Sequence, residues 1–154
     1  MAAPTPESIP ELLSAQLAQR TTVILSMTAS WSPSQAMVNL HPGGPCGHNT
    51  LQHLIEVTYT TLAALELEIP LRGSGESWPD LKERFETVSG KLAEQVCSLS
   101  PADLEEAPSI ELLPEFKESL TNRQVFLMGH VFHLAYHAGQ LGSLAALLSR
   151  STPA

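Results

Sequence analysis

Residues 77–99 read SWPDLKERFETVSGKLAEQVCSL, and this stretch decides the class of fold. Its apolar side chains recur at steps of three and four residues, at Leu81, Phe85, Val88, Leu92, Val96 and Leu99. Positions three and four apart share one face of an α-helix, so the spacing predicts an amphipathic helix that starts near Ser77 to Pro79. The apolar stripe of such a helix must be buried against partners, which favours an all-α domain of packed helices.

Two helices are predicted before this one. The first opens with SIPE at residues 8–11, a capping box with proline in its first turn, and ends before Trp31. The second is expected to be capped by Asn49, with Gln52 three residues on, and to run to about Leu67.

A fourth helix is predicted to be capped by Thr121, with Gln124 three residues on, and to run to about Ser149. The connections at residues 30–48 and 70–75 are rich in glycine and proline and are therefore loops. Residues 100–120 are expected to form a long irregular arm with a short helical turn. The acidic residues of this arm, Glu105, Glu106, Glu111 and Glu115, are interpreted as a solvated surface.

Composition limits the classes of function. A chain of 154 residues is expected to form one domain, residues 1–154, with a substantial core. The formal net charge is −8 without any Lys/Arg cluster, which argues against nucleic acid or an anionic membrane as a partner. No apolar run approaches the length of a membrane span, and no signal peptide is recognised. Cys46 and Cys97 are the only two cysteines and are far apart, so a cytoplasmic location is expected. Each is interpreted as a small buried hydrophobic residue.

The candidate functional residues lie in the last helix, where residues 129–141 read GHVFHLAYHAGQL. His133 and His137 are four residues apart, so their imidazoles lie about 6 Å from each other on one helix face. Neutral imidazole is a common ligand of zinc and similar metals. His130 and Gln140 fall in the same stripe, whose other members are mostly apolar. The stripe is therefore expected to face the core, where each polar group needs a partner.

A third ligand has to come from another helix. The candidates are His41, His48 and His53, of which only His53 lies well inside a predicted helix. His41 and His48 belong to a segment rich in glycine and proline, so they are interpreted as exposed or capping residues. Sequence spacing alone does not show which of the three is the third ligand, because none of them lies on the helix that carries His133 and His137.

The histidine early in the second helix and the pattern His133-x-x-x-His137-x-Gly139-Gln140 in the fourth resemble the DinB/YfiT-like superfamily. The resemblance covers most of the chain, from the first helix to Ser149. It implies a four-helix bundle with up-down-down-up topology, often a homodimer. It also implies that His53, His133 and His137 bind a divalent metal, with zinc, nickel or iron all compatible. The family usually has arginine directly after the last histidine, where this chain has Ala138.

Three histidines leave an open coordination position, which is typical of a catalytic metal site. A metal there activates a bound water or stabilises the thiolate of a cosubstrate. Some members of the family are transferases or isomerases that use a low-molecular-weight thiol, so the resemblance implies such a cosubstrate and a small-molecule substrate. Glu56, one turn from His53, is a candidate base, or else a surface carboxylate. Gln140, one turn past His137, is a candidate for orienting a ligand. Tyr136 and His130 are interpreted as packing residues.

Three classes of function are compatible with these observations. The first is a metal-dependent transferase, or a related hydrolase or isomerase, that acts on a small molecule. The second is a metal-binding helical bundle without catalysis, such as a stress-related or interaction protein. The third is a helical interaction module whose histidines are incidental. The metal content of the purified protein separates the third class from the other two.

Overall fold

The computed structural model describes residues 5–111 and 117–151, and the regular structure in these ranges is helical apart from one isolated bridge between Asn39 and Cys46. The prediction of an all-α fold is thus confirmed. The long helices are α1 (Ile9–Thr28), α3 (Gly47–Ala64), α4 (Trp78–Cys97) and α7 (Arg123–Ser151), and the short ones are α2 (Pro33–Ala36) and α5 (Pro101–Glu105).

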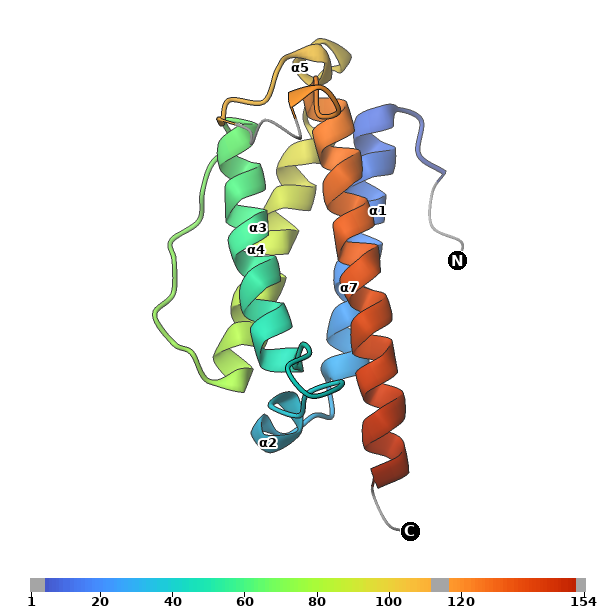
Figure 1. The fold of residues 1–154 in the computed structure, drawn as a ribbon. Helices are drawn as coiled ribbons and strands as arrows, with labels where there is room; N and C mark the ends of the chain where they lie inside the picture. The colour runs from blue at the N-terminus through green and yellow to red at the C-terminus, as the bar shows by residue number, and fades with distance from the viewer. Residues whose placement is uncertain (1–4, 112–116, 152–154) are drawn as a thin grey trace.

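The long helices lie side by side (Figure 1). Helices α1 and α7 run from the end that carries α5 towards the end that carries α2, and α3 and α4 run the opposite way (Figure 1). Both α1 and α3 pack against α4 and against α7. None of the helices in the described ranges is long and apolar enough to cross a membrane.

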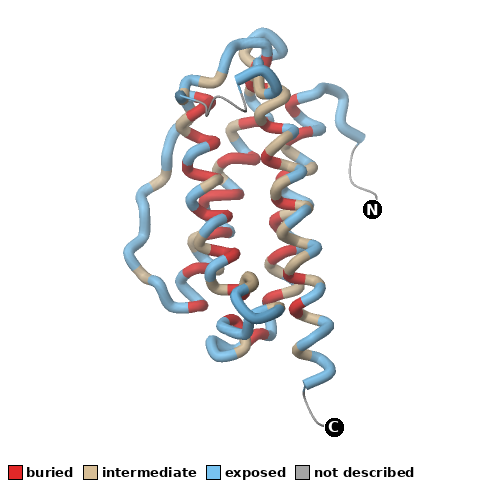
Figure 2. The backbone as a smooth tube through the Cα atoms, viewed as in Figure 1, coloured by how far each residue is buried: buried red, intermediate tan, exposed pale blue. Residues whose placement is uncertain are grey.

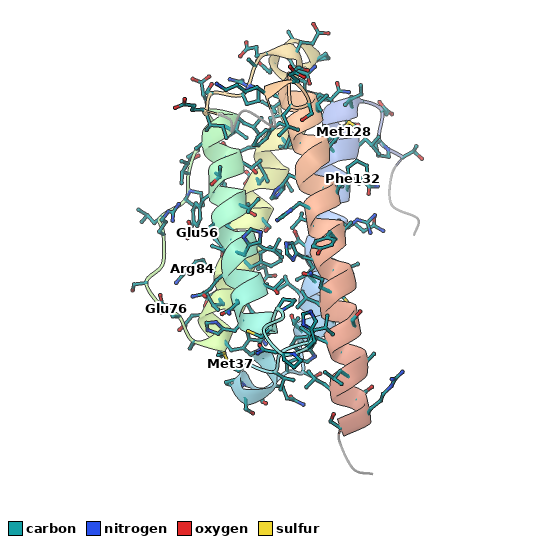
Figure 3. The ribbon with its side chains drawn as sticks, viewed as in Figure 1. Met37, Glu56, Glu76, Arg84, Met128 and Phe132 are labelled. Atoms are coloured by element: carbon teal, nitrogen blue, oxygen red, sulfur yellow. The ribbon has the colours of Figure 1, made fainter. Side chains whose placement is uncertain are left out.

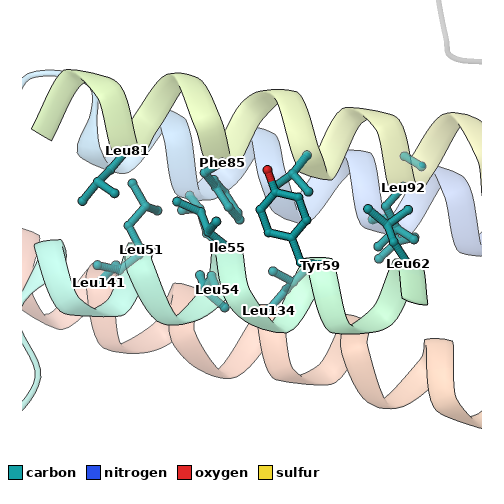
Figure 4. Packing of buried hydrophobic residues seen from close by; sticks show 14 of the residues in the cluster. Leu51, Leu54, Ile55, Tyr59, Leu62, Leu81, Phe85, Leu92, Leu134 and Leu141 are labelled. Carbon is teal, nitrogen blue, oxygen red and sulfur yellow. The ribbon is translucent and has the colours of Figure 1, made fainter. Parts of the chain in front are cut away.

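The core lies between the long helices, whose buried residues face inward (Figure 2). The stripe predicted for residues 77–99 is confirmed, because its side chains from Leu81 to Val96 are almost fully buried and Leu99 is partly buried. Figure 4 shows Leu81 and Phe85 of α4 against Leu51 and Ile55 of α3. Burying one such side chain contributes about 1.5–3 kcal/mol, so this contact between α3 and α4 stabilises the fold.

The start of α4 agrees with the prediction. Ser77 is the N-cap, its hydroxyl accepts a hydrogen bond from the Asp80 amide, and the Asp80 carboxylate accepts one from the Ser77 amide. At α1 the predicted capping box is only half formed. Ser8 accepts from the Glu11 amide at 3.3 Å, whereas the Glu11 carboxylate accepts from the amide of Glu7.

The predicted limits of the second and fourth helices are wrong by one to three residues. Helix α3 is capped by Cys46, whose sulfur accepts a hydrogen bond from the Asn49 amide at 3.5 Å, so Asn49 lies inside the helix. It ends at Ala64, three residues before Leu67, since Glu66 adopts a left-handed backbone conformation with φ 55°. Helix α7 is capped by Asn122 rather than Thr121, because the Asn122 side-chain oxygen accepts from the Val125 amide at 2.9 Å.

The connections contain the two short helices. Helix α2 was not expected in the 30–48 segment, although Ser32 and Gln35 form a capping box around it. Helix α5 is the short helical turn expected in the 100–120 arm.

The acidic arm is solvated as predicted at Glu105, Glu106 and Glu111, while Glu115 lies outside the described residues. Glu106 also pairs with the buried Arg123 guanidinium at 3.1 Å. The interpretation of both cysteines as buried is confirmed for Cys46 and wrong for Cys97, which is exposed at the end of α4.

Candidate metal centre

Helices α3 and α7 bring the three predicted histidines together. His53 comes from the second turn of α3, and His133 and His137 come from successive turns of α7. One nitrogen of each imidazole lies within 4.8 Å of the corresponding nitrogen of the other two. The Nε2 atoms of His53 and His133 are 2.8 Å apart, and the ring centroids of His133 and His137 are 4.6 Å apart.

This donor set fits a divalent transition metal. Zinc binds imidazole nitrogen at about 2.0–2.1 Å, so two nitrogens on one tetrahedral ion are roughly 3.3 Å apart. One of the separations between the three histidines is 2.8 Å, and none exceeds 4.8 Å. The three imidazoles therefore lie close enough together to share one ion.

Two of the histidines are held in the neutral form that a metal requires. Partial burial disfavours the imidazolium and, together with the nearby His137 and His53, lowers the pKa of His133 to about 4. Burial also lowers the pKa of His137, although the hydrogen bond to Gln140 acts in the opposite direction. At neutral pH both rings consequently present a lone pair, so binding a cation does not first require the loss of a proton.

Gln140 orients His137. Its side-chain oxygen lies 2.8 Å from Nδ1 of His137, and its amide nitrogen donates to the Tyr136 hydroxyl at 3.0 Å. Because the amide oxygen can only accept, it fixes a proton on Nδ1 and leaves Nε2 of His137 free for a metal. The sequence indicated Gln140 but not the role of Tyr136, although their spacing of four residues on one helix is the signal that would have shown it.

Glu56 lies beside the centre without joining it. Its carboxylate accepts two hydrogen bonds from Arg72, at 2.7 and 3.0 Å, and both side chains are largely exposed. Glu56 and His53 line the same hollow, of about 360 Å³, together with Glu76 and Arg84. Figure 3 shows Glu56, Glu76 and Arg84 on the side of α3 that faces the connection to α4.

The remaining histidines have other roles. His130 is buried and its Nδ1 lies 3.3 Å from the Thr61 hydroxyl, and burial lowers its pKa to about 3. His41 is exposed beside the Pro42 carbonyl, and Nε2 of His48 lies 3.0 Å from the Glu76 carbonyl oxygen. Neither His41 nor His48 belongs to the three-histidine group, which leaves His53 as the third ligand candidate.

The expectation that the histidine stripe faces the core is only partly right. His130 is buried, but His133 and His137 are half-buried and His53 is exposed. The stripe is wide enough to extend past the core to the edge of the contact between α7 and α3. The candidate metal ligands lie at that edge. A second hollow of about 480 Å³ reaches His133 from the α5 end and is lined mainly by apolar groups, among them Val57, Leu120 and Phe126.

No protein-family model matches the chain, and no curated protein matches it either. Function is accordingly inferred from the three-histidine centre and its surroundings.

Proposed function

We propose that this protein is a DinB/YfiT-like four-helix bundle, of up-down-down-up topology, that binds one divalent transition metal. The observation that carries the proposal is the convergence of His53, His133 and His137, with one nitrogen of each within 4.8 Å of the others. The opposite directions of the α1/α7 and α3/α4 pairs support the topology (Figure 1). Zinc, nickel and iron all accept three imidazoles, so the donor set does not choose among them.

The activity we propose is metal-dependent transfer to or from a small molecule, with a low-molecular-weight thiol as cosubstrate. A metal held by three protein ligands supplies Lewis acidity at an open position, where a water or a thiol binds. Gln140 keeps His137 in the ligating tautomer, and the apolar hollow beside His133 receives the apolar part of a substrate. Cys46 is buried as the cap of α3, and the exposed Cys97 lines neither of the two hollows beside the three histidines, so the reacting sulfur is expected to belong to the cosubstrate.

Glu56 is the proposed base. Glu56 lines the same hollow as His53. Its carboxylate would therefore accept a proton from a group bound beside the three histidines. The ion pair with Arg72 holds the carboxylate in place and competes for its lone pairs. This competition is the specific observation that favours the second candidate function, a metal-binding bundle without catalysis.

Turnover assays separate the two functions. The metal-loaded protein is incubated with a panel of physiological thiols and alkyl or epoxide electrophiles, and thiol consumption is followed. We expect turnover that stops after chelation and in the His137→Ala variant, falls in Glu56→Gln with metal content unchanged, and persists in His41→Ala. An absence of metal-dependent turnover across the panel in a protein that still binds metal would establish the non-catalytic function instead.

A further inference from the structure

A groove of about 430 Å³ lies between helices α1 and α7. Helix α1 contributes side chains from residues 9 to 20 to its lining, and helix α7 contributes side chains from residues 124 to 135. At a rise of about 1.5 Å per residue, each of these spans extends roughly 17 Å along its helix. The volume is within the range of about 300–1,000 Å³ that is usual for small-molecule pockets. The groove therefore has the size of a site for one small, elongated molecule.

Most of the lining is apolar and accessible. The exposed fraction is 49% for Ile9 and 47% for Leu12 on α1, and 40% for Met128 and 69% for Phe132 on α7. Figure 3 shows Met128 and Phe132 one turn apart on α7. Within residues 5–111 and 117–151, no aspartate or glutamate lines the groove. A continuous apolar patch of this kind marks a binding site on a protein surface.

The groove carries its charge at one end. Arg20 is the one charged residue that lines it in the described part of the chain. Helices α1 and α7 run in the same direction (Figure 1), so Ile9 and Gln124 lie towards one end of the groove, and Arg20 and Ala135 towards the other. A ligand that matches this lining is apolar along its length and has a negative charge at one end.

The guanidinium of Arg20 is not satisfied by the described residues. Its Nε is buried without a hydrogen-bond partner, and Arg20 forms no ion pair within the described ranges. A buried donor without an acceptor is costly, so this geometry favours an acceptor that a ligand supplies. Two adjacent N–H groups of a guanidinium match the two oxygens of a carboxylate, which makes this the best-fitting acceptor.

We propose that the groove binds a medium-chain alkyl carboxylate, with its carboxylate on Arg20 and its alkyl chain along the apolar side chains towards Ile9. The single cation of the groove balances one negative charge. The formal net charge of −8 disfavours ligands with more negative charge than that. None of the three histidines of the candidate metal centre lines the groove, so this site is independent of the proposed function.

The test is isothermal titration calorimetry with decanoate, below the concentration at which it forms micelles. We expect one decanoate to bind per chain. Affinity should increase about fourfold for each methylene group added between octanoate and decanoate, because each added group is buried in the groove. The affinity should be the same before and after treatment of the protein with a chelator, since a metal takes no part in this site.

Two pairs of variants locate the ligand. Arg20→Gln should lower the affinity for decanoate about 10-fold or more, because the bonds to a charged donor are lost. Arg150→Gln removes the same charge from the exposed end of α7 and should bind as the wild type does. Leu12→Glu places a carboxylate in the groove and should weaken binding. Its matched control is Leu71→Glu in the connection between α3 and α4, where Leu71 is 98% exposed.

Several outcomes would overturn the proposal. Equal affinities of the wild type and Arg20→Gln would exclude Arg20 as the carboxylate partner, and an affinity independent of alkyl length would exclude burial in the groove. Binding that disappears after chelation or in His137→Ala would mean that the carboxylate binds a metal at the three histidines. A chain that binds no decanoate also refutes the site, and a two-chain mass in light scattering would then show that a second copy covers the groove.

Discussion

Among single residues outside the proposed ligand set, Gln140 has the clearest consequence for the proposed metal centre. It joins His137 to Tyr136 and thereby selects which ring nitrogen of His137 faces the other two histidines. The i, i+4 spacing of His133 and His137 and the position of Gln140 were readable from the sequence, because one helix fixes their relative placement. The ion pair of Glu56 with Arg72 was not readable from the sequence, because Arg72 lies in a loop whose path depends on the tertiary structure.

Replacing Gln140 by Leu should lower metal affinity about 10- to 100-fold, the usual cost of losing a group that orients a ligating histidine. At saturating metal the stoichiometry should remain that of the wild type. Competition with a chromophoric chelator measures both quantities. Tyr136→Phe, which keeps the bond from Gln140 to His137, is the control and should change affinity less. Equal affinities of wild type and Gln140→Leu would show that Gln140 does not orient His137.

His130 makes stability depend on pH. Its pKa is lowered to about 3 in the folded protein by burial, whereas an unfolded histidine has a pKa of about 6.5. Below pH 6.5 the unfolded state therefore binds more protons, so the stability contributed by neutral His130 is present above pH 6.5 and is lost as pH falls towards 3.

The test compares wild type with His130→Gln, which cannot titrate but can still bond to Thr61. Between pH 7.5 and pH 5 the wild type should lose roughly 2 kcal/mol more of its unfolding free energy than the variant. Urea titrations at each pH, with chelator present throughout, measure the difference. Parallel pH profiles for the two proteins would mean that His130 does not stay neutral in the fold.

At the scale of helices, the sequence predicted which helices exist better than it predicted the residues where they begin and end. The stripe of α4 was decisive because six apolar residues keep one period, and the start predicted near Ser77 to Pro79 agrees with Ser77 as the N-cap. The start of α3 was misplaced because cysteine is not among the preferred N-cap residues, so Cys46 gave no signal. At α7 two suitable residues, Thr121 and Asn122, are adjacent, and only the structure shows which one caps.

The cap of α7 can be tested directly. Asn122→Ala should lower the unfolding free energy by about 1 kcal/mol, the typical value of an N-cap, because the Val125 amide loses its acceptor. Thr121→Ala should change it by much less, since Thr121 is exposed and lies outside the helix. Urea unfolding at constant pH measures both. A larger loss in Thr121→Ala than in Asn122→Ala would restore the sequence-based assignment.

At the scale of the whole molecule, an all-α fold followed from the sequence, but the candidate metal centre did not follow completely. His53 and the pair on α7 are about 80 positions apart in the chain, and only the packing of α3 against α7 makes their nitrogens converge. In the same structure His41 lies beside the Pro42 carbonyl and His48 beside the Glu76 carbonyl. The sequence alone could not predict these contacts. The position of the candidate centre at the edge of the α3–α7 contact also depends on packing. Sequence periodicity does not distinguish residues at the edge of an apolar stripe from those in its middle.

The metal content of the purified chain, measured by elemental mass spectrometry after loading and desalting, tests the three-histidine centre most directly. We expect about one divalent transition metal per chain in the wild type and in His41→Ala, and a loss of most of it in His53→Ala, His133→Ala and His137→Ala. The variants should remain helical, because none of the three side chains is part of the apolar core. Metal content that is absent in the wild type, or unchanged in all three variants, would contradict the centre.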